Sequence, residues 1–162
     1  MNLKDDIGSN LEIRKVEHRD LDRILSIERS SFPTPWPKYM FEVMFSRNRE
    51  GFMVAVVESE VVGYGIIRIE KNLRFGGQNL EEVGHLLDLA VSEGYRGDNI
   101  GSALLEELEN HVKHEVGEIW LEVREGSQSA RQFYLNNGYE DVGIKNSYYP
   151  DGMNAVIMRK KL

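Results

Sequence analysis

The sequence predicts a mixed α/β fold. Segments in which apolar and polar residues alternate, as in β-strands, are interspersed with segments whose apolar residues recur at helical spacing. Strands and helices alternate from about residue 83 onward, and this order calls for a parallel or splayed pair of strands there. Before that point, two strand-like segments are separated by a tight turn only, which is typical of an antiparallel hairpin.

The first half of the chain predicts three strands and two helices. Alternation indicates the strands, and a stripe of Leu21, Ile24 and Leu25 indicates the first helix. Prolines at 33, 35 and 37 end that helix, and the last of them can open the next one. The second and third strands are joined by a turn at Ser59 and Glu60. The expected elements are strands over 11–16, 52–58 and 61–70, helices over 20–31 and 37–45, and a loop over 71–82 that contains Gly76 and Gly77.

The second half predicts four strands and two helices. Its first strand is apolar enough to be largely buried. The helix that follows places its leucines inward and its glutamates mostly outward, and the second helix ends at Gly138, the expected left-handed cap. The expected elements are strands over 83–91, 119–124, 139–145 and 154–160, and helices over 101–114 and 129–137.

Length and composition restrict the class of protein. A chain of 162 residues has the usual length of one domain, so we expect a single domain over residues 1–162. No apolar run approaches the ~20 residues that span a bilayer, and the N-terminus lacks the pattern of a signal peptide. The absence of cysteine excludes disulfide scaffolds, zinc–thiolate sites, iron–sulfur clusters and cysteine nucleophiles. These features favour the cytoplasm.

The charge balance bears on partners. A formal net charge of −7 gives no basic footprint for nucleic acid, and Arg159 to Lys161 is interpreted as a solvated tail. An acidic surface suits a cationic substrate such as an amine or a basic peptide, although acidity also serves solubility. His18, His111 and His114 form no ligand spacing with carboxylates. We therefore expect no nucleic acid, membrane or metal among the partners.

The segment from Tyr95 to Leu105 joins a buried strand to an amphipathic helix. This context presents free backbone N–H groups beside the positive end of a helix dipole, where an anion is favoured. Gly97 and Gly101 remove side chains where a phosphate oxygen would approach. The segment is neither a P-loop nor a dinucleotide fingerprint. From the residues alone, a phosphate site and a plain glycine-containing turn are equally compatible with it.

Residues 96–101 resemble the Gln/Arg-x-x-Gly-x-Gly/Ala pyrophosphate loop of the GNAT acetyltransferase superfamily, and residues 84–91 resemble its fourth strand. The resemblance implies the GNAT fold, a mixed central sheet with a splayed parallel strand pair that holds acetyl-CoA and with helices on both faces. Asn99 stands where the family usually has glycine, and asparagine is the residue that best tolerates a positive φ after glycine. The residues that would bind acetyl-CoA are Leu89, Ala90, Val91, Arg96, Gly97, Asp98, Asn99, Ile100, Gly101 and Ser102.

A second block extends the likeness. Residues 121–124 and 130–139 are similar to the Leu-Glu-Val-Arg…Ala…Tyr…Gly-Phe block of protein N-terminal acetyltransferases, with ribosomal-protein-alanine acetyltransferases of the RimI type as the nearest match. Residues 148–158 resemble the same group and the catalytic subunits of N-terminal acetyltransferase A. Each motif is weak alone, but their order and spacing together are specific.

The resemblance implies direct attack of a free amine on the thioester, with Glu122 as general base. An α-amino group has an unperturbed pKa of ~7.7–8.0 and must lose a proton at neutral pH. A carboxyl group with a pKa near ~4.3 is a poor base unless burial raises that pKa, and Trp120 on the same strand face would supply part of the apolar surroundings. The alternative for Glu122 is an ordinary strand residue paired with a neighbouring strand or arginine.

Tyr134 matches the position that donates a proton to the departing thiolate of CoA. A phenol suits this role because its pKa of ~10 lies not far above the ~8.5 of a thiol. The alternative is a packing aromatic, for which Phe133 is the better candidate. Ser127 matches a frequent asparagine that hydrogen-bonds the pantetheine, and its hydroxyl offers a shorter contact.

Two aromatic segments, Phe32 to Trp36 and Tyr148-Tyr149, are candidates for holding a peptide N-terminus, or for covering one end of the sheet. Phe32, Trp36, Tyr148 and Tyr149 are therefore the expected acceptor-binding residues. His85 begins the predicted fourth strand. It either relays a proton, as in some N-terminal acetyltransferases, or is structural.

The sequence thus predicts an enzyme that transfers acetyl from acetyl-CoA to the α-amine of a protein N-terminus, with a ribosomal protein as one candidate target. One alternative is a small-molecule amine acetyltransferase, which would lack the Tyr148-Tyr149 wall. Another is a module that binds CoA as a sensor without catalysis. Asn99 and Ser127, which depart from the family's usual residues, would fit such a loss of activity. The presence of Glu122 and Tyr134 argues against the latter. Whether an auxiliary subunit takes part is left open.

Overall fold

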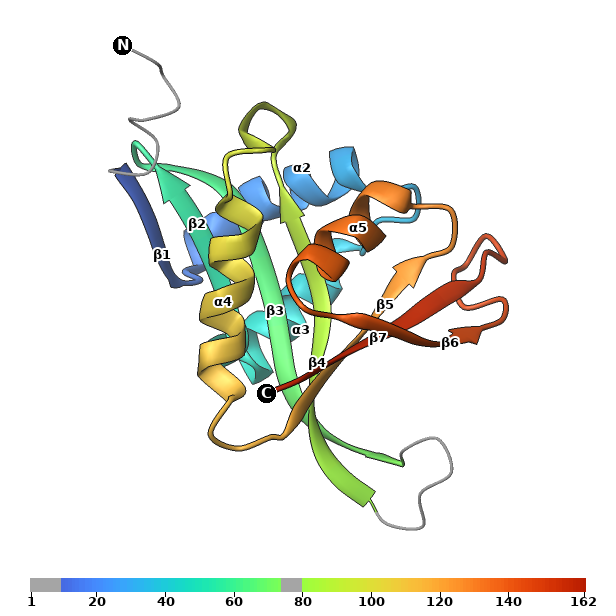
Figure 1. Ribbon diagram of the computed structural model, residues 1–162. Coiled ribbons are helices and arrows are strands. Elements are labelled where there is room, and N and C mark those ends of the chain that lie inside the picture. Colours follow the sequence, from blue (N-terminus) through green and yellow to red (C-terminus); the bar gives the residue numbers. More distant parts are fainter. Residues whose placement is uncertain (1–9, 74–79) are drawn as a thin grey trace. The chain divides into compact units, whose positions relative to one another are not determined.

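The computed structural model describes residues 10–73 and 80–162 (Figure 1). Within this part, the chain forms two compact units. Unit 1 contains residues 10–67 and 88–108, and unit 2 contains residues 68–73, 80–87 and 109–162. The single domain expected from the sequence stays a prediction.

The strands form a mixed sheet in the order β1-β2-β3-β4-β5-β7-β6. In unit 1, β1 pairs antiparallel with β2, and β2 with β3. In unit 2, β7 pairs antiparallel with β5 and β6, whereas β4 and β5 are parallel, with Gly84 opposite Ile119 and Leu86 opposite Leu121. The predicted mixed α/β class and its parallel pair are therefore confirmed. The strands are β1 (Leu11–Lys15), β2 (Phe52–Val57), β3 (Glu60–Leu73), β4 (Leu80–Val91), β5 (Glu118–Arg124), β6 (Glu140–Lys145) and β7 (Ala155–Lys161).

Four α-helices and three short 3-10 turns are present in the described part of the chain. Pro37 is the N-cap of α3, one position before the first helical turn in which it was expected, and Gly138 follows α5 with a φ of +91°. The α-helices are α2 (Leu21–Ser31), α3 (Lys38–Arg47), α4 (Ile100–Val112) and α5 (Gln128–Asn136), and the 3-10 turns are η1 (His18–Asp20), η2 (Arg49–Gly51) and η3 (Glu93–Tyr95).

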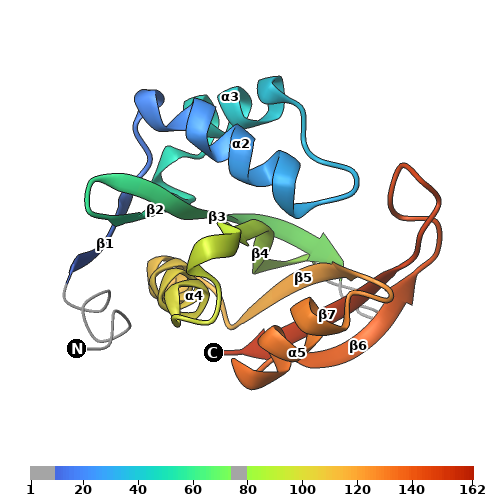
Figure 2. The same cartoon turned by 90° about the horizontal axis from the view of Figure 1, so that it is seen from above.

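Helices cover both faces of the strands in unit 1. Figure 2 shows α2 and α3 on one side of β2 and β3, and α4 on the other. On the first side, the ring of Phe41 from α3 lies 5.7 Å from that of Tyr64 in β3. On the second side, Ile100 and Leu104 of α4 pack with a buried cluster from β2 and β3. The apolar stripes predicted for α2 and α4, which include Ile24 and Leu104, are buried in this core.

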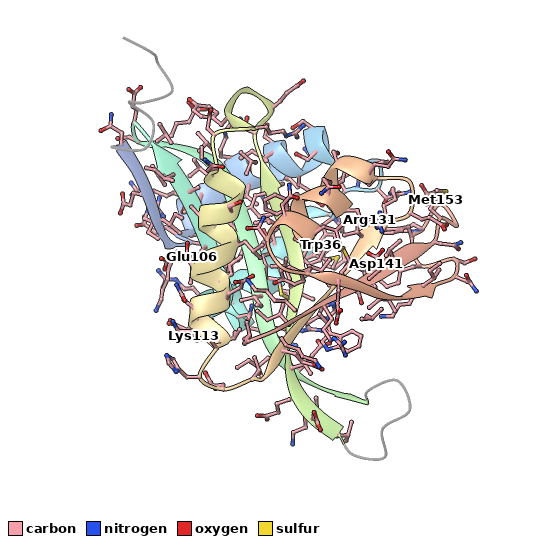
Figure 3. The ribbon with its side chains drawn as sticks, in the orientation of Figure 1. Trp36, Glu106, Lys113, Arg131, Asp141 and Met153 are labelled. Carbon is pink, nitrogen blue, oxygen red and sulfur yellow. The ribbon has the colours of Figure 1, made fainter. Side chains whose placement is uncertain are left out.

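Unit 2 has a core of its own. Val83 of β4, Trp120 of β5 and Ile157 of β7 form a buried cluster, with Val142 of β6 packed against it. On the surface of this unit, the Nε of Arg131 in α5 donates to Asp141 Oδ2 of β6 at 2.9 Å (Figure 3).

Most element ends lie within one or two residues of those predicted, and two connections differ from the prediction. The hairpin turn lies at Glu58 and Ser59, one residue earlier than expected, and both residues adopt a positive φ of 49° and 68°. Such a two-residue turn is usually signalled by Asn-Gly or Asp-Gly, and this sequence has neither there. The predicted loop over 71–82 is shorter, because β3 continues to Leu73 and β4 begins at Leu80. Gly76 and Gly77 lie outside the described residues.

No helix among residues 10–73 and 80–162 is long and apolar enough to span a membrane.

Candidate functional site

The predicted phosphate loop lies in unit 1, between the end of β4 and the start of α4. Gly97 and Asn99 both have a positive φ, at 82° and 62°. Asn99 therefore adopts the left-handed conformation that asparagine tolerates best after glycine. A Cβ on Gly97 would meet no atom within 4 Å, so this side of the loop is open.

The start of α4 fits a phosphate group. The N–H groups of Ile100, Gly101 and Ser102 belong to the first helical turn, where no intrahelical acceptor exists. The helix dipole adds partial positive charge at the same place. Side chains of Leu89 and Val91 pack against the cluster that includes Ile100 and Leu104, so this end of β4 is fixed against α4. Ala90 between them is buried.

Arg96 has a role that the sequence did not indicate. Its Nε donates to the carbonyl oxygen of Val91 at 2.9 Å, and its terminal nitrogen donates to Ser31 Oγ at 3.2 Å. The side chain thus ties the loop to the end of β4 and to the last residue of α2. The backbone amides, rather than this guanidinium, are the groups of the loop that suit an anion.

The segment from Phe32 to Trp36 also belongs to unit 1. Phe32 is 37% exposed, and Trp36 is half-buried with its ring 5.5 Å from that of Phe41. The segment therefore presents one aromatic side chain to solvent and anchors the other against α3.

Unit 2 contains a chain of four polar side chains from β3, β4, β5 and β6. Glu70 Oε1 lies 2.8 Å from His85 Nδ1, and His85 Nε2 lies 2.6 Å from Glu122 Oε2. The Nζ of Lys145 donates to the other oxygen of Glu122 at 2.8 Å. The side chains of His85 and Glu122 are 15% and 9% exposed, so the central contact is largely shielded from water. The candidate proton relay, His85, and the candidate general base, Glu122, are therefore in direct contact.

The charges of these four side chains oppose the expectation that burial raises the pKa of Glu122. Burial acts to raise the pKa of Glu122, as expected, but hydrogen bonds and charges of His85 and Lys145 outweigh it, and the pKa lies below its usual range. Burial likewise acts to lower the pKa of His85, yet Glu122 and Glu70 outweigh it and raise that pKa above 6.5. The expectation that burial makes Glu122 a stronger base is wrong. The group whose pKa moves toward that of an amine is His85.

Tyr148 and Tyr149 lie in the same unit. Their rings are perpendicular at 5.0 Å, with Lys145 Nζ 5.3 Å from the centre of the Tyr148 ring and the guanidinium of Arg124 4.3 Å from that of Tyr149. Burial and the charges of Glu122 and Glu70 raise the pKa of Tyr148 to about 12. Tyr148 is therefore a neutral hydroxyl whose surroundings include the Glu122 carboxylate.

Tyr134 lies on α5, with its ring 5.0 Å from that of Phe133 and 5.6 Å from that of Tyr139. Both Tyr134 and Phe133 are half-buried, so burial does not separate a packing residue from a chemical one. Ser127 is the N-cap of α5, and its hydroxyl makes no capping hydrogen bond.

The structure thus distributes the predicted residues over the two units. The expected cofactor segment and Phe32–Trp36 lie in unit 1, whereas Glu122, Tyr134, Ser127 and Tyr148-Tyr149 lie in unit 2. Sequence reasoning missed Glu70 and Lys145, because neither lies in a recognisable motif. Among the described residues, no group of three or more His, Asp or Glu side chains is arranged to hold a metal ion.

The chain is similar in sequence and in structure to known acetyltransferases. The sequence profile of the acetyltransferase (GNAT) family matches residues 21–139. An N-alpha-acetyltransferase of Sulfurisphaera tokodaii is 34% identical, with 96% of this chain and 95% of the relative covered. A ribosomal protein bS18-alanine N-acetyltransferase of Haemophilus influenzae is 29% identical, with 90% and 95% covered. The crystal structure of Ard1 from Thermoplasma volcanium matches with a TM-score of 0.82 at 25% identity, over 94% of this chain and 98% of that one.

Proposed function

The chain belongs to the GNAT family of acetyltransferases, and we propose that it acetylates the α-amino group of protein N-termini with acetyl-CoA as the donor. The observation that carries this proposal is the shielded contact between His85 and Glu122. An imidazole whose pKa is raised above 6.5 is matched to an α-amine, whose unperturbed pKa is ~7.7–8.0. The N-alpha-acetyltransferase relative at 34% identity supports the same acceptor.

The residues of unit 1 fit the donor. Acetyl-CoA, when bound, supplies an acetyl group activated as a thioester. We assign its pyrophosphate to the loop amides from Gly97 to Ser102 and its pantetheine arm to the backbone of residues 89–91. From the family resemblance alone, we also assign a hydrogen bond to the pantetheine to the hydroxyl of Ser127.

Replacing Gly101 with valine tests the loop. A β-branched side chain in the first turn of α4 would occupy the approach to the amides, so we expect acetyl-CoA to bind at least about tenfold more weakly. Thermal melting should change little, because valine is tolerated in a helix at a modest cost. Calorimetry with acetyl-CoA measures the affinity, and Gly94→Val serves as the control, since a Cβ on Gly94 meets nothing within 4 Å. Equal affinity of the folded Gly101→Val protein and wild type would remove the loop from the site.

Proton transfer is assigned to unit 2. The nitrogen lone pair of the acceptor forms a bond to the acetyl carbon, and the bond between that carbon and sulfur breaks. The amine proton passes to the His85–Glu122 pair. The pair can accept this proton only when the imidazole of His85 is in its neutral form. Glu70 Oε1 accepts from the other ring nitrogen and fixes the orientation of the imidazole. The departing thiolate takes a proton from the hydroxyl of Tyr134.

This assignment fixes a pH dependence. His85 holds a proton below its raised pKa, so activity should fall as the pH drops through that pKa, at a pH above 6.5. The pH profile of kcat/KM with a peptide substrate measures it.

The acceptor is tested with a peptide that carries both a free α-amine and an internal lysine. We expect acetylation at the N-terminus, because at neutral pH the lysine amine, with an unperturbed pKa of ~10.4, is in the free-base form roughly 300-fold less often than the α-amine. Mass spectrometry of the fragmented product locates the acetyl group. Two control peptides are matched to it, one with a blocked N-terminus and one with arginine in place of lysine. Acetyl groups mainly on lysine, or on a free small amine but not on peptides, would contradict the proposal.

The proposal extends to a specific acceptor and to a location. A ribosomal protein with an N-terminal alanine is the specific acceptor suggested by the likeness to the Haemophilus enzyme. Its N-terminal peptide, compared with peptides that begin with other residues, tests that choice. We place the reaction in the cytoplasm, in line with the composition.

A further inference from the structure

A polar cluster in unit 1, with two of its three side chains buried, has no part in the proton transfer described above. It consists of Glu28 on α2, Tyr64 on β3 and Asp88 on β4. The Tyr64 hydroxyl donates to Glu28 Oε2 and lies 3.3 Å from Asp88 Oδ2. Glu28 is 2% exposed and Tyr64 is fully buried. An ionisable side chain is rarely buried to this degree without partners.

The second carboxylate oxygen of Glu28 reaches a different part of the chain. Glu28 Oε1 accepts from the backbone N–H of Trp36 at 2.8 Å. The carbonyl oxygen of the same residue accepts from the backbone N–H of Phe32 at 3.1 Å. One residue therefore holds both ends of the segment from Phe32 to Trp36.

The composition of this segment makes the Trp36 contact decisive. Prolines at 33, 35 and 37 have no N–H, so Thr34 and Trp36 carry the only backbone donors over 33–37. The segment cannot be held by a ladder of backbone hydrogen bonds. Its C-terminal end is fixed by the Glu28 carboxylate and by the packing of Trp36 on Phe41.

The cluster also disfavours a charge on Asp88. Burial, together with the nearby charge of Glu28, raises the pKa of Asp88 well above its usual range. The Tyr64 hydroxyl contacts both carboxyl groups and so links Asp88 to Glu28.

We propose that Glu28 is a positioning residue, which holds Phe32 and Trp36 in the conformation that receives the acceptor peptide and takes no part in the chemical step. The inference rests on the proposed function, because it assigns these two aromatic residues to the acceptor. It predicts that the loss of Glu28 weakens the peptide's interaction and leaves the donor's unchanged.

The test compares two substitutions of similar size. Glu28→Gln keeps an oxygen that can accept from Trp36, whereas Glu28→Met fills the same space without such an acceptor. We expect Glu28→Met to raise KM for the peptide about tenfold or more, with kcat and KM for acetyl-CoA within about twofold of wild type. Glu28→Gln should restore most of the peptide KM. Ile24→Ala, a cavity in the same helix, is the control for lost stability, and it should lower the melting temperature without raising the peptide KM.

A second measurement uses the wild-type protein and does not depend on whether Glu28→Met folds. The Trp36 amide should be protected from hydrogen exchange, because its N–H is bound to a buried carboxylate. Fast exchange at Trp36 would overturn the inference, as would an equal rise of KM for both substrates, or an effect of Ile24→Ala on the peptide KM. Failure of the proposed function would look different, since wild type would then acetylate no peptide N-terminus at all.

Discussion

Replacing Glu122 with glutamine is expected to reduce kcat/KM at neutral pH by about 10²–10⁴-fold, the usual contribution of a general acid–base group. The substitution keeps the size of the side chain and removes the carboxylate that hydrogen-bonds His85 at 2.6 Å and Lys145 at 2.8 Å. Without that charge, burial is the dominant influence on His85, so the pKa of His85 should fall. Proton NMR of the imidazole across a pH titration measures this shift without reference to activity.

Glu118→Gln is the matched control for this variant. Glu118 lies on the same strand and is buried, but its carboxylate accepts from the indole of Trp120, a contact that an amide oxygen can preserve. We expect it to keep near wild-type kcat/KM. Activity of Glu122→Gln within about threefold of wild type would identify Glu122 as an ordinary strand residue. An unchanged titration of His85 would show that the two groups are not coupled.

The second large effect is expected from Tyr134→Phe. The ring and its contacts with Phe133 and Tyr139 are kept, and only the hydroxyl that protonates the thiolate is lost. We expect kcat to fall by about 10²–10⁴-fold while calorimetry shows near-normal affinity for acetyl-CoA. The measurement is steady-state release of CoA with a saturating peptide.

Tyr139→Phe provides the comparison, because it removes a hydroxyl from the neighbouring ring. That hydroxyl donates to Glu109 at 3.0 Å, and Lys160 remains as a partner of Glu109 at 2.7 Å. Its loss should affect stability more than kcat. If Tyr134→Phe and Tyr139→Phe behave alike, Tyr134 is a packing residue.

Local patterns in the sequence were sufficient for most of the fold. Alternation and helical spacing located the strands and helices, because burial of one face imposes a period that survives in the residues themselves. The positive φ of Asn99 agrees with its place at the family's usual glycine and with the tolerance of asparagine for that conformation. The turn at Glu58 and Ser59 was misplaced by one residue because neither residue type demands a left-handed conformation.

The polar clusters could not be predicted in the same way. Glu70, His85 and Glu122 are separated by 15 and 37 residues, and their contact depends on the register of β3, β4 and β5. Register is set by pairing across the sheet and leaves no local signature for a polar residue. The predicted rise of the Glu122 pKa was wrong for the same reason, since the effects of His85 and Lys145 on that pKa outweigh burial.

The strand order also has a consequence for self-association. The outermost strands of the described sheet are β1 in unit 1 and β6 in unit 2, and exposed edges of this kind are templates for pairing between molecules. Glu12 and Lys15 are exposed on β1, as are Glu140, Asp141 and Lys145 on β6. The register of β6 against β7 is also interrupted between Asp141 and Gly143. Charge on both edges and an irregularity on one disfavour the edge-to-edge pairing of strands that leads to aggregates. This protection holds on β6 even though Ile144 is 55% exposed there.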